Sequence, residues 1–170
     1  MCDDPDAVDE LFDRIESEIG RSDAVLLWKV SCGMRRPALE HNRNRVKNSI
    51  AVSGVITCNT VPNCLAYRPD GSTAIKTANG ITRGGMAGPA IHAIALDHAA
   101  FMTEELHLSD NKIVIGAGGA DDTKTVCNFI RTGASLVQTQ SAFREMGESP
   151  DFIRDVNLDL VEEFKGVPLS

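Results

Sequence analysis

Two segments rich in glycine and hydroxyl residues are the part of the sequence best suited to chemistry. Residues 113–119 read IVIGAGG, and residues 133–141 read GASLVQTQS. Each combines a short apolar run with small or hydroxyl residues, and one helix's length of sequence separates the two. This is the layout of a phosphate site at the mouth of a β/α barrel. The spacing therefore predicts a site for a phosphorylated cofactor.

Gly118 and Gly119 carry the physical side of this prediction. Without a Cβ they can adopt positive φ and let backbone N–H groups approach an anion. A helix beginning near Asp121 would aim the positive end of its dipole at the same point. The alternative is that the two glycines only make a tight turn from a strand into a helix. A Gly-Gly pair taken alone favours that alternative.

The composition is that of a soluble globular protein. The chain has 170 residues, 42% of them hydrophobic, and a formal net charge of -7. These values predict a single domain over residues 1–170 with a sizeable core. The chain is shorter than a complete eight-stranded barrel, which takes ~250 residues. Its acidic balance argues against nucleic acids and anionic membranes as partners, and no apolar run is long enough to span a bilayer.

The cysteines and the N-terminus bear on the cellular compartment. The chain has five cysteines: Cys2, Cys32, Cys58, Cys64 and Cys127. Their odd number and the lack of paired CxxC spacing predict reduced thiols and no disulfide framework. Cys32 and Cys64 lie near candidate site segments, and we expect both to be small buried hydrophobes and not catalytic thiols. The first six residues, MCDDPD, include three aspartates, whereas a signal peptide begins with a basic and then an apolar segment. We therefore expect a cytoplasmic protein.

The histidines do not predict a metal site. The sequence has no HxxxH pair and no His/Cys cluster. His92 and His98 lie six residues apart on a predicted helix, so they face different directions. We expect both at the helix surface.

Helix and strand signals alternate along the chain. Apolar residues at helical spacing predict helices over residues 4–20 and 89–102. We also expect helices over residues 36–48, a polar stretch, and over residues 121–131 and 150–164. Short apolar or β-branched runs predict strands over residues 24–29, 52–58, 112–116 and 135–139. Strands that alternate with helices predict an α/β fold with a parallel sheet.

Residues 60–88 interrupt this alternation. They contain turn-forming pairs at 62–63, 69–72, 79–80 and 84–85, over a stretch too long for an ordinary connection. We expect a long functional loop, or a hairpin that turns at Asp70 and Gly71 between residues 65–67 and 73–75.

Five ordered blocks resemble the C-terminal half of the dihydroorotate dehydrogenases. They are a strand ending in Lys29, then TCNT at 57–60, GGMAG at 84–88, GAGG at 116–119 and GASLVQ at 133–138. The resemblance covers residues 22–165 and implies parallel β/α units that form about half of a TIM (β/α)8 barrel. The spacing between Asn59 and Gly84 looks most like the soluble branch of the family. The flavin-and-pyrimidine half of dihydropyrimidine dehydrogenase is similar as well.

The resemblance implies FMN as the cofactor and a small-molecule pyrimidine as the substrate. Lys29 matches a lysine beside the flavin N1/O2 edge, where a cation stabilises the anion formed on reduction. Its alternative role is a strand-end lysine that reaches water. Asn59 and Thr60 match residues that hydrogen-bond the pyrimidine, although an asparagine at a strand end is also a common turn former. The other positions that match flavin contacts are Cys58, Gly88, Gly118, Gly119, Gln140 and Ser141.

Two departures from the family pattern limit what the resemblance implies. Gln140 and Ser141 stand where the family places Gly-Thr against the phosphate, so a glutamine side chain either crowds that phosphate or replaces a backbone contact. The family's base is a Cys or Ser that removes the C5 proton of dihydroorotate while the flavin takes hydride from C6. That base lies upstream of the lysine-ending strand, and no residue here matches it. We therefore assign no catalytic residue.

Two functions remain open at this point. One is an FMN oxidoreductase that oxidises dihydroorotate to orotate in pyrimidine biosynthesis, acting within a completed barrel. The other is a non-catalytic flavin- or phosphate-binding or assembly module related to the family. Four parallel strands would leave two open sheet edges. We therefore expect a homo-oligomer or a partner chain that completes the barrel.

Overall fold

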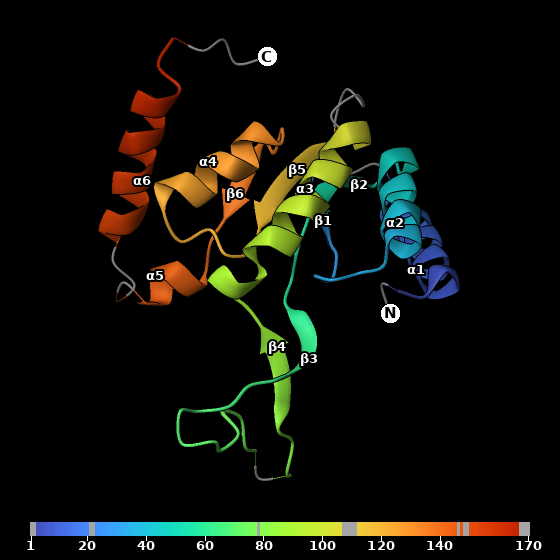
Figure 1. The fold of residues 1–170 in the computed structure, drawn as a ribbon. Helices are drawn as coiled ribbons and strands as arrows, with labels where there is room; N and C mark the ends of the chain where they lie inside the picture. Colours follow the sequence, from blue (N-terminus) through green and yellow to red (C-terminus); the bar gives the residue numbers. More distant parts are fainter. Residues whose placement is uncertain are drawn as a thin grey trace.

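In the computed structural model of the protein, four parallel strands form one sheet with helices packed beside it (Figure 1). The structure describes residues 3–20, 23–77, 79–106, 112–145, 147 and 150–166. The strands of the sheet, in spatial order, are β1 (Leu26–Lys29), β2 (Val52–Ile56), β5 (Ile113–Ala117) and β6 (Leu136–Gln138). The helices are α1 (Pro5–Glu18), α2 (Arg36–Asn48), the short 3-10 turn η1 (Pro89–Ile91), α3 (His92–Leu106), α4 (Thr123–Arg131), α5 (Ser141–Glu145) and α6 (Pro150–Glu163). The predicted parallel α/β fold is confirmed.

One face of the sheet is covered by helices. Alternate strand residues such as Trp28, Val55 and Val114 point toward them and join a buried apolar cluster. Phe12 of α1 packs on Trp28 with ring centroids 4.8 Å apart. A second cluster, around Phe129 of α4, continues this core toward β6. Burial of apolar surface on this face therefore holds the fold together.

The other face of the sheet is largely open. Leu27, Ile56 and Ile115 are half-buried there, and Leu136 is 56% exposed. These side chains line a hollow of about 1350 Å³, counting space open to solvent, which also has walls from α4 and α6. In the described part of the chain, β1 pairs only with β2 and β6 only with β5. The sheet thus has one bare face and two free edges.

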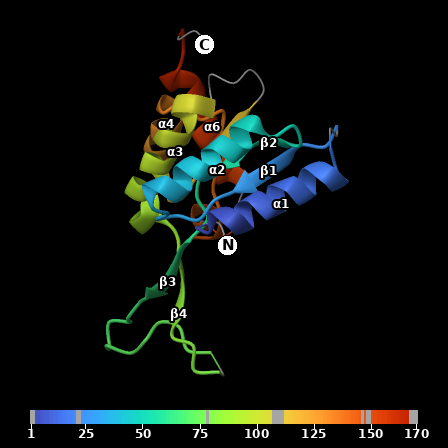
Figure 2. The same cartoon turned by 90° about the vertical axis from the view of Figure 1, so that its right-hand side faces the viewer.

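Residues 60–77 and 79–88 form an arm that projects away from the sheet (Figures 1 and 2). At its base, β3 (Val61–Leu65) pairs antiparallel with β4 (Arg83–Met86). The chain turns where Gly71 N donates to Arg68 O (2.9 Å), so the predicted turn is confirmed. The two segments predicted to form a hairpin, 65–67 and 73–75, pair antiparallel: Tyr67 bridges Thr73, and Ala74 N donates to Ala66 O (2.8 Å). The pairing is short, and of these residues only Leu65 belongs to one of the strands.

The pairing of β3 with β4 at the base of the arm was not predicted, because β4 contains two glycines. Gly84 and Gly85 read as turn residues, yet both lie in β4. A Cβ on Gly84 would lie 2.4 Å from Ile75 Cδ1, and one on Gly85 would lie 2.4 Å from Thr60 Oγ1. The glycines therefore allow neighbouring side chains to approach this strand closely. That requirement depends on tertiary contacts and not on the local sequence pattern.

The structure also bears on the predictions about membrane helices and surface histidines. Among the described residues no helix is long and apolar enough to cross a membrane. His98 is only 3% exposed, so the expectation of a surface histidine is wrong there, and burial lowers the pKa of its imidazole. Helix α3 lies between neighbouring helices and the sheet, and therefore buries more than one face. Cys2 and His107 lie outside the described residues.

Candidate functional site

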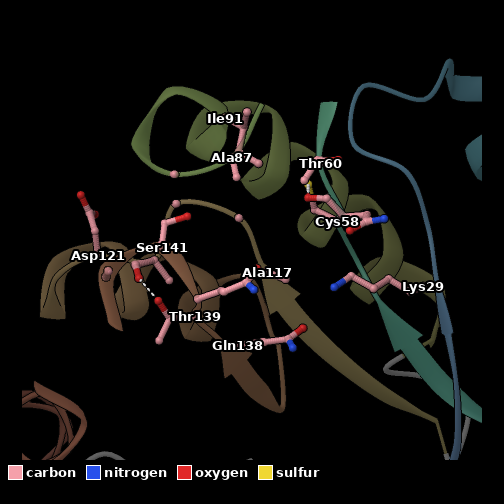
Figure 3. Close-up of a pocket in the computed structure, with 17 residues that line it drawn as sticks. Lys29, Cys58, Thr60, Ala87, Ile91, Ala117, Asp121, Gln138, Thr139 and Ser141 are labelled. Carbon is pink, nitrogen blue, oxygen red and sulfur yellow. Dashed lines mark hydrogen bonds between the residues drawn. The ribbon is translucent and has the colours of Figure 1, made fainter. Parts of the chain in front are cut away.

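A hollow opens at the carboxyl ends of the four parallel strands (Figure 3). It measures about 530 Å³, counting the space open to solvent. The structure brings together here all of the residues predicted to bind cofactor or substrate: Lys29, Cys58, Asn59, Thr60, Gly88, Gly118, Gly119, Gln140 and Ser141. Their convergence follows from topology, because the carboxyl ends of parallel strands meet at one edge of a sheet.

Lys29 and Gln138 face each other at the floor of the hollow. Lys29 ends β1 and Gln138 ends β6, and both side chains lie on the bare face of the sheet. Figure 3 shows the ammonium group of Lys29 and the amide of Gln138 directed toward the same space. A cation and a neutral hydrogen-bonding group are thus available at the inner end of the site. Gln138 was not predicted as a site residue, although its place at the end of a predicted strand was a usable signal.

Asn59, Thr60 and Cys58 follow β2 and form a second wall. The ladder continues past the end of β2, because Asn59 N donates to Val30 O (2.9 Å) and Thr57 N donates to Ile115 O (3.0 Å). This pairing holds Asn59 beside the end of β1, with its side chain exposed. Thr60 begins the arm and lies against Gly85. The backbone of Asn59 is therefore fixed beside the end of β1, and Asn59 and Thr60 line the same hollow as Lys29.

The glycine turn after β5 adopts the conformation predicted for it. Gly118 has φ 117° and Gly119 has φ 68°, both in the positive range that favours glycine. A Cβ on Gly119 would lie 2.8 Å from Gly88 O and 2.9 Å from His92 Cβ. The turn therefore fits closely against the segment that leads into α3, and a larger residue has no space there.

His92 supports this glycine turn, a role that was not predicted from the sequence. Its Nδ1 lies 3.3 Å from Gly118 O, and its Nε2 lies 3.4 Å from Asn128 Nδ2. The ring also meets the edge of Phe129, with centroids 5.2 Å apart. If the Asn128 amide donates to Nε2, then Nδ1 carries the hydrogen and donates to the carbonyl of Gly118. No local motif signals this role, because the partners come from three separate segments.

The N-terminus of α4 differs from the expectation of an anion site. Asp122 is its N-cap and accepts hydrogen bonds from Thr125 N (2.7 Å) and Thr125 Oγ1 (2.8 Å), which lower the pKa of the Asp122 carboxyl. Asp121, the preceding residue, lines the hollow. The carboxylate of Asp122 therefore already caps this helix end, and a phosphate placed there would be repelled by negative charge.

A cradle suited to a phosphate remains between the glycine turn, Gly88 and Ser141. Gly88 has φ 78°, and a Cβ placed on it would lie 3.7 Å from Ser141 Cβ, so this part of the hollow is bounded by backbone and one hydroxyl. Thr139 Oγ1 donates to Ala120 O (2.6 Å) and ties the end of β6 to the turn after β5. Gln140 lies at the rim and is exposed, so its side chain does not fill the cradle. These groups fit a phosphate ester.

No metal-binding arrangement accompanies this hollow. Within the part of the chain that the structure describes, no three His, Cys, Asp or Glu side chains gather in a way that could hold a metal ion. Cys32, Cys58, Cys64 and Cys127 are free thiols.

Comparison with known proteins agrees with this geometry. The family model described as dihydroorotate dehydrogenase matches residues 5–162. Dihydroorotate dehydrogenase (quinone) of Haloarcula marismortui is 28% identical over 165 residues, covering 94% of this chain and 43% of that protein. Dihydroorotate dehydrogenase (quinone), mitochondrial, of Schizosaccharomyces pombe is 31% identical over 115 residues, covering 68% of this chain and 24% of that protein. The chain spans less than half the length of these relatives.

A solved structure shows a similar fold. The crystal structure of DHODH in complex with ferulenol from Eimeria tenella superposes with a TM-score of 0.60 at 16% identity, over 83% of this chain and 35% of that one. The predicted partial TIM barrel is thereby confirmed. The predicted likeness to the soluble branch is not supported, because the relatives named above are quinone enzymes.

Proposed function

Because the chain belongs to the dihydroorotate dehydrogenase family, we propose that it serves the oxidation of dihydroorotate to orotate in pyrimidine biosynthesis, with FMN as cofactor. One observation carries the proposal: every residue assigned to FMN or to the pyrimidine lines the same hollow at the carboxyl ends of the strands. Since the chain spans 43% of the archaeal relative, turnover is proposed for a completed barrel and not for this chain alone.

Each part of the hollow has a role in this proposal. FMN, when bound, supplies the acceptor for the hydride that leaves the substrate. Lys29 stabilises negative charge at the inner end of the site through its ammonium group. Asn59 and Thr60 orient the pyrimidine by hydrogen bonds. The backbone of Gly88 and of the glycine turn, with the Ser141 hydroxyl, holds the phosphate.

Reduction of bound flavin by dihydroorotate tests the catalytic proposal. In an FMN-loaded, completed barrel, dihydroorotate added without oxygen should bleach the flavin absorption band. Lys29→Ala should slow this bleaching about tenfold or more, because the developing charge loses its cation, which corresponds to ~1.4 kcal/mol or more of transition-state stabilisation. Lys76→Ala, which removes an ammonium from the arm, is the matched control and should leave the rate unchanged. Equal rates for Lys29→Ala and the control would reject the role of Lys29.

A non-catalytic binding module is the second candidate. Gln140 favours it, because this residue stands where the family has a glycine against the phosphate. On this alternative the chain binds FMN, yet dihydroorotate leaves the flavin oxidised even in a completed barrel. The same bleaching experiment therefore separates the two functions.

The open face of the sheet supports assembly with a second copy or with a partner chain. It exposes Leu136 beside half-buried Ile115, at the unpaired edge of β6. Leu136→Glu should weaken this assembly in sedimentation velocity. Ile81→Glu changes a residue of similar exposure on the arm, 54% against 56%, and should not. A protein that sediments as a monomer at all concentrations and with all partner fractions would remove the proposal.

Two finer points complete the proposal. We take a quinone as the electron acceptor in place of the soluble-branch assignment, because the related archaeal and fission-yeast proteins bear that designation. Turnover with a water-soluble acceptor and none with a quinone would reverse this choice.

The free thiols of Cys32, Cys58, Cys64 and Cys127 support a cytoplasmic location, which imaging of the tagged protein tests.

A further inference from the structure

The phosphate cradle has no cation beside it. Among the residues that line the hollow, Lys29 is the one cation. It ends β1, whereas Ser141 of the cradle follows β6, at the opposite edge of the sheet. The N-terminus of α4 is already capped by Asp122. Affinity for a phosphate therefore depends on where the backbone N–H groups of the glycine turn are directed.

One peptide group of this turn, between Gly118 and Gly119, is held from one side. In a trans peptide the carbonyl and the N–H point in opposite directions, and the described residues contain no cis peptide. His92 Nδ1 lies 3.3 Å from Gly118 O, so the N–H of Gly119 points away from this histidine. Among the described residues none accepts a hydrogen bond from Gly119 N. Since Gly119 lines the hollow, this donor is available to a ligand there.

The contacts of His92 make its hold on the turn directional. Gly118 O can only accept a hydrogen bond, so Nδ1 is the ring nitrogen that carries the hydrogen. Nε2 then accepts, and Asn128 Nδ2, 3.4 Å away, donates to it. The edge contact with Phe129 fixes the plane of the ring. Both ring nitrogens thus have protein partners, and His92 is not among the residues that line the hollow. It acts on a ligand only through the turn.

We propose that His92 is a positioning residue for phosphate recognition: by holding Gly118 O, it directs the N–H of Gly119 at the phosphate of the bound cofactor. The inference rests on the proposed function, because FMN is the ligand assigned there to this hollow. Without the imidazole, the peptide between the two glycines is free to rotate, since neither residue has a Cβ to restrict it. A rotated peptide presents its carbonyl oxygen to the phosphate in place of its N–H, and repels it.

The preference for FMN over riboflavin, which lacks the phosphate, tests this role. His92→Phe keeps a ring against Phe129 and removes both hydrogen bonds. The ratio of FMN affinity to riboflavin affinity should fall about tenfold in this variant, because a hydrogen bond to a charged group is weakened. Riboflavin affinity itself should not change. A ratio equal to that of the natural chain would overturn the inference.

His41→Phe is the matched control. His41 lies on α2, where its Nε2 is 2.9 Å from Asp9 Oδ1, and it is not among the residues that line the hollow. The same substitution there should leave the ratio of the two affinities unchanged. A ratio that falls equally in His41→Phe would also overturn the inference.

Two amide variants separate positioning from a general structural role. The Nδ2 of an asparagine stands where a histidine has Nδ1, and the Nε2 of a glutamine stands where a histidine has Nε2. His92→Asn therefore keeps the donor to Gly118 O and should restore most of the preference for FMN. His92→Gln places its donor toward Asn128 and should not restore it. Equal preferences in the two variants, compared as folded proteins by circular dichroism, would contradict the assigned role.

The amide resonance of Gly119 reports the hydrogen bond itself. In protein with isotope-labelled glycine, FMN should move the Gly119 amide proton downfield, because the phosphate accepts its hydrogen bond. Riboflavin should not move it, and neither should FMN in His92→Phe. The same shift with both flavins, or an unchanged FMN shift in His92→Phe, would overturn the inference.

The titrations also distinguish this inference from the proposed function. A natural chain that binds FMN no more tightly than riboflavin contradicts the proposed phosphate site, and the inference falls with it. A natural chain that prefers FMN, together with a His92→Phe variant that prefers it equally, contradicts the inference alone.

Discussion

The two faces of the sheet differ in what they contribute. On the helix-covered face, Phe12 and Phe129 are fully buried and pack against the strands and neighbouring helices. On the bare face, Leu136 is 56% exposed, and Lys29 lies at the end of the same surface. The covered face therefore supplies most of the stability of this chain. The bare face supplies the polar groups of the site and the surface for assembly.

This difference shows how a partial barrel can fold while its site stays dependent on other surfaces. Apolar burial needs only one closed layer between a sheet and its helices. A ligand hollow at the strand ends gains enclosure when the ring of strands is complete. Stability and binding should therefore respond to different substitutions.

The largest expected effect is the difference in stability loss between a Leu→Ala substitution on the covered face and one on the bare face. Leu39 of α2 is 1% exposed within the covered core, whereas Leu136 is 56% exposed on the bare face. Leu39→Ala should lower the free energy of unfolding by about 2–5 kcal/mol, through lost burial and a cavity. Leu136→Ala should change it by only about 0.5 kcal/mol. Urea denaturation of both variants measures this, and similar losses would break the distinction between the faces.

A smaller effect is expected at the glycine turn, where the two faces meet. Gly119 has φ 68° and no space for a Cβ, whereas Gly71 on the arm has φ 79° with nothing within 4 Å. Both Ala variants carry the cost of positive φ, of order 1–3 kcal/mol where the strain persists. Gly119→Ala should in addition distort the cradle and reduce FMN affinity at least tenfold. Isothermal titration checks this, and equal FMN affinity in the two variants would show that the turn does not hold the ligand.

The smallest effect concerns the cap of α4. Hydrogen bonds from Thr125 keep the pKa of Asp122 below its ordinary value, which is about 3.9 in an unfolded chain. Stability from a lowered carboxyl pKa is fully present above the unfolded value and is lost as pH falls through the folded value. Asp122→Asn keeps a capping oxygen without a titrating charge, and Asp122→Ala should cost about 0.5–2 kcal/mol near neutral pH.

Urea denaturation of these variants from about pH 7 to about pH 3 tests the sign. The stability advantage of the natural chain over Asp122→Asn should shrink below about pH 4. An advantage that stays constant over the whole range would show that the carboxylate charge does not stabilise the cap.

Much of the fold was predictable because its signals are local. The run of β-branched residues at Ile113–Ala117 and the cap-and-proline start of α1 each specify one element. The gathering of Lys29, Asn59 and Gly119 was also predictable, since strand ends meet at one edge. β4 was not predictable, because its glycines suit a strand only once Thr60 and Ile75 lie against it.

Other features depend on contacts that no window of sequence contains. Helix α5 has five residues, too few for a periodic pattern. His92 acts through Gly118 and Asn128, which lie 26 and 36 residues away in the chain. In each case the local residues permit several arrangements, and packing selects one.

The most direct test of the cradle at the strand ends compares FMN with riboflavin, which lacks the phosphate, in fluorescence titrations of this protein. The hydrogen-bond donors of the glycine turn, Gly88 and Ser141 predict saturable FMN binding and at least tenfold weaker binding of riboflavin, a difference of about 1.4 kcal/mol or more. No saturable binding of FMN, or equal affinity for the two flavins, would contradict the account.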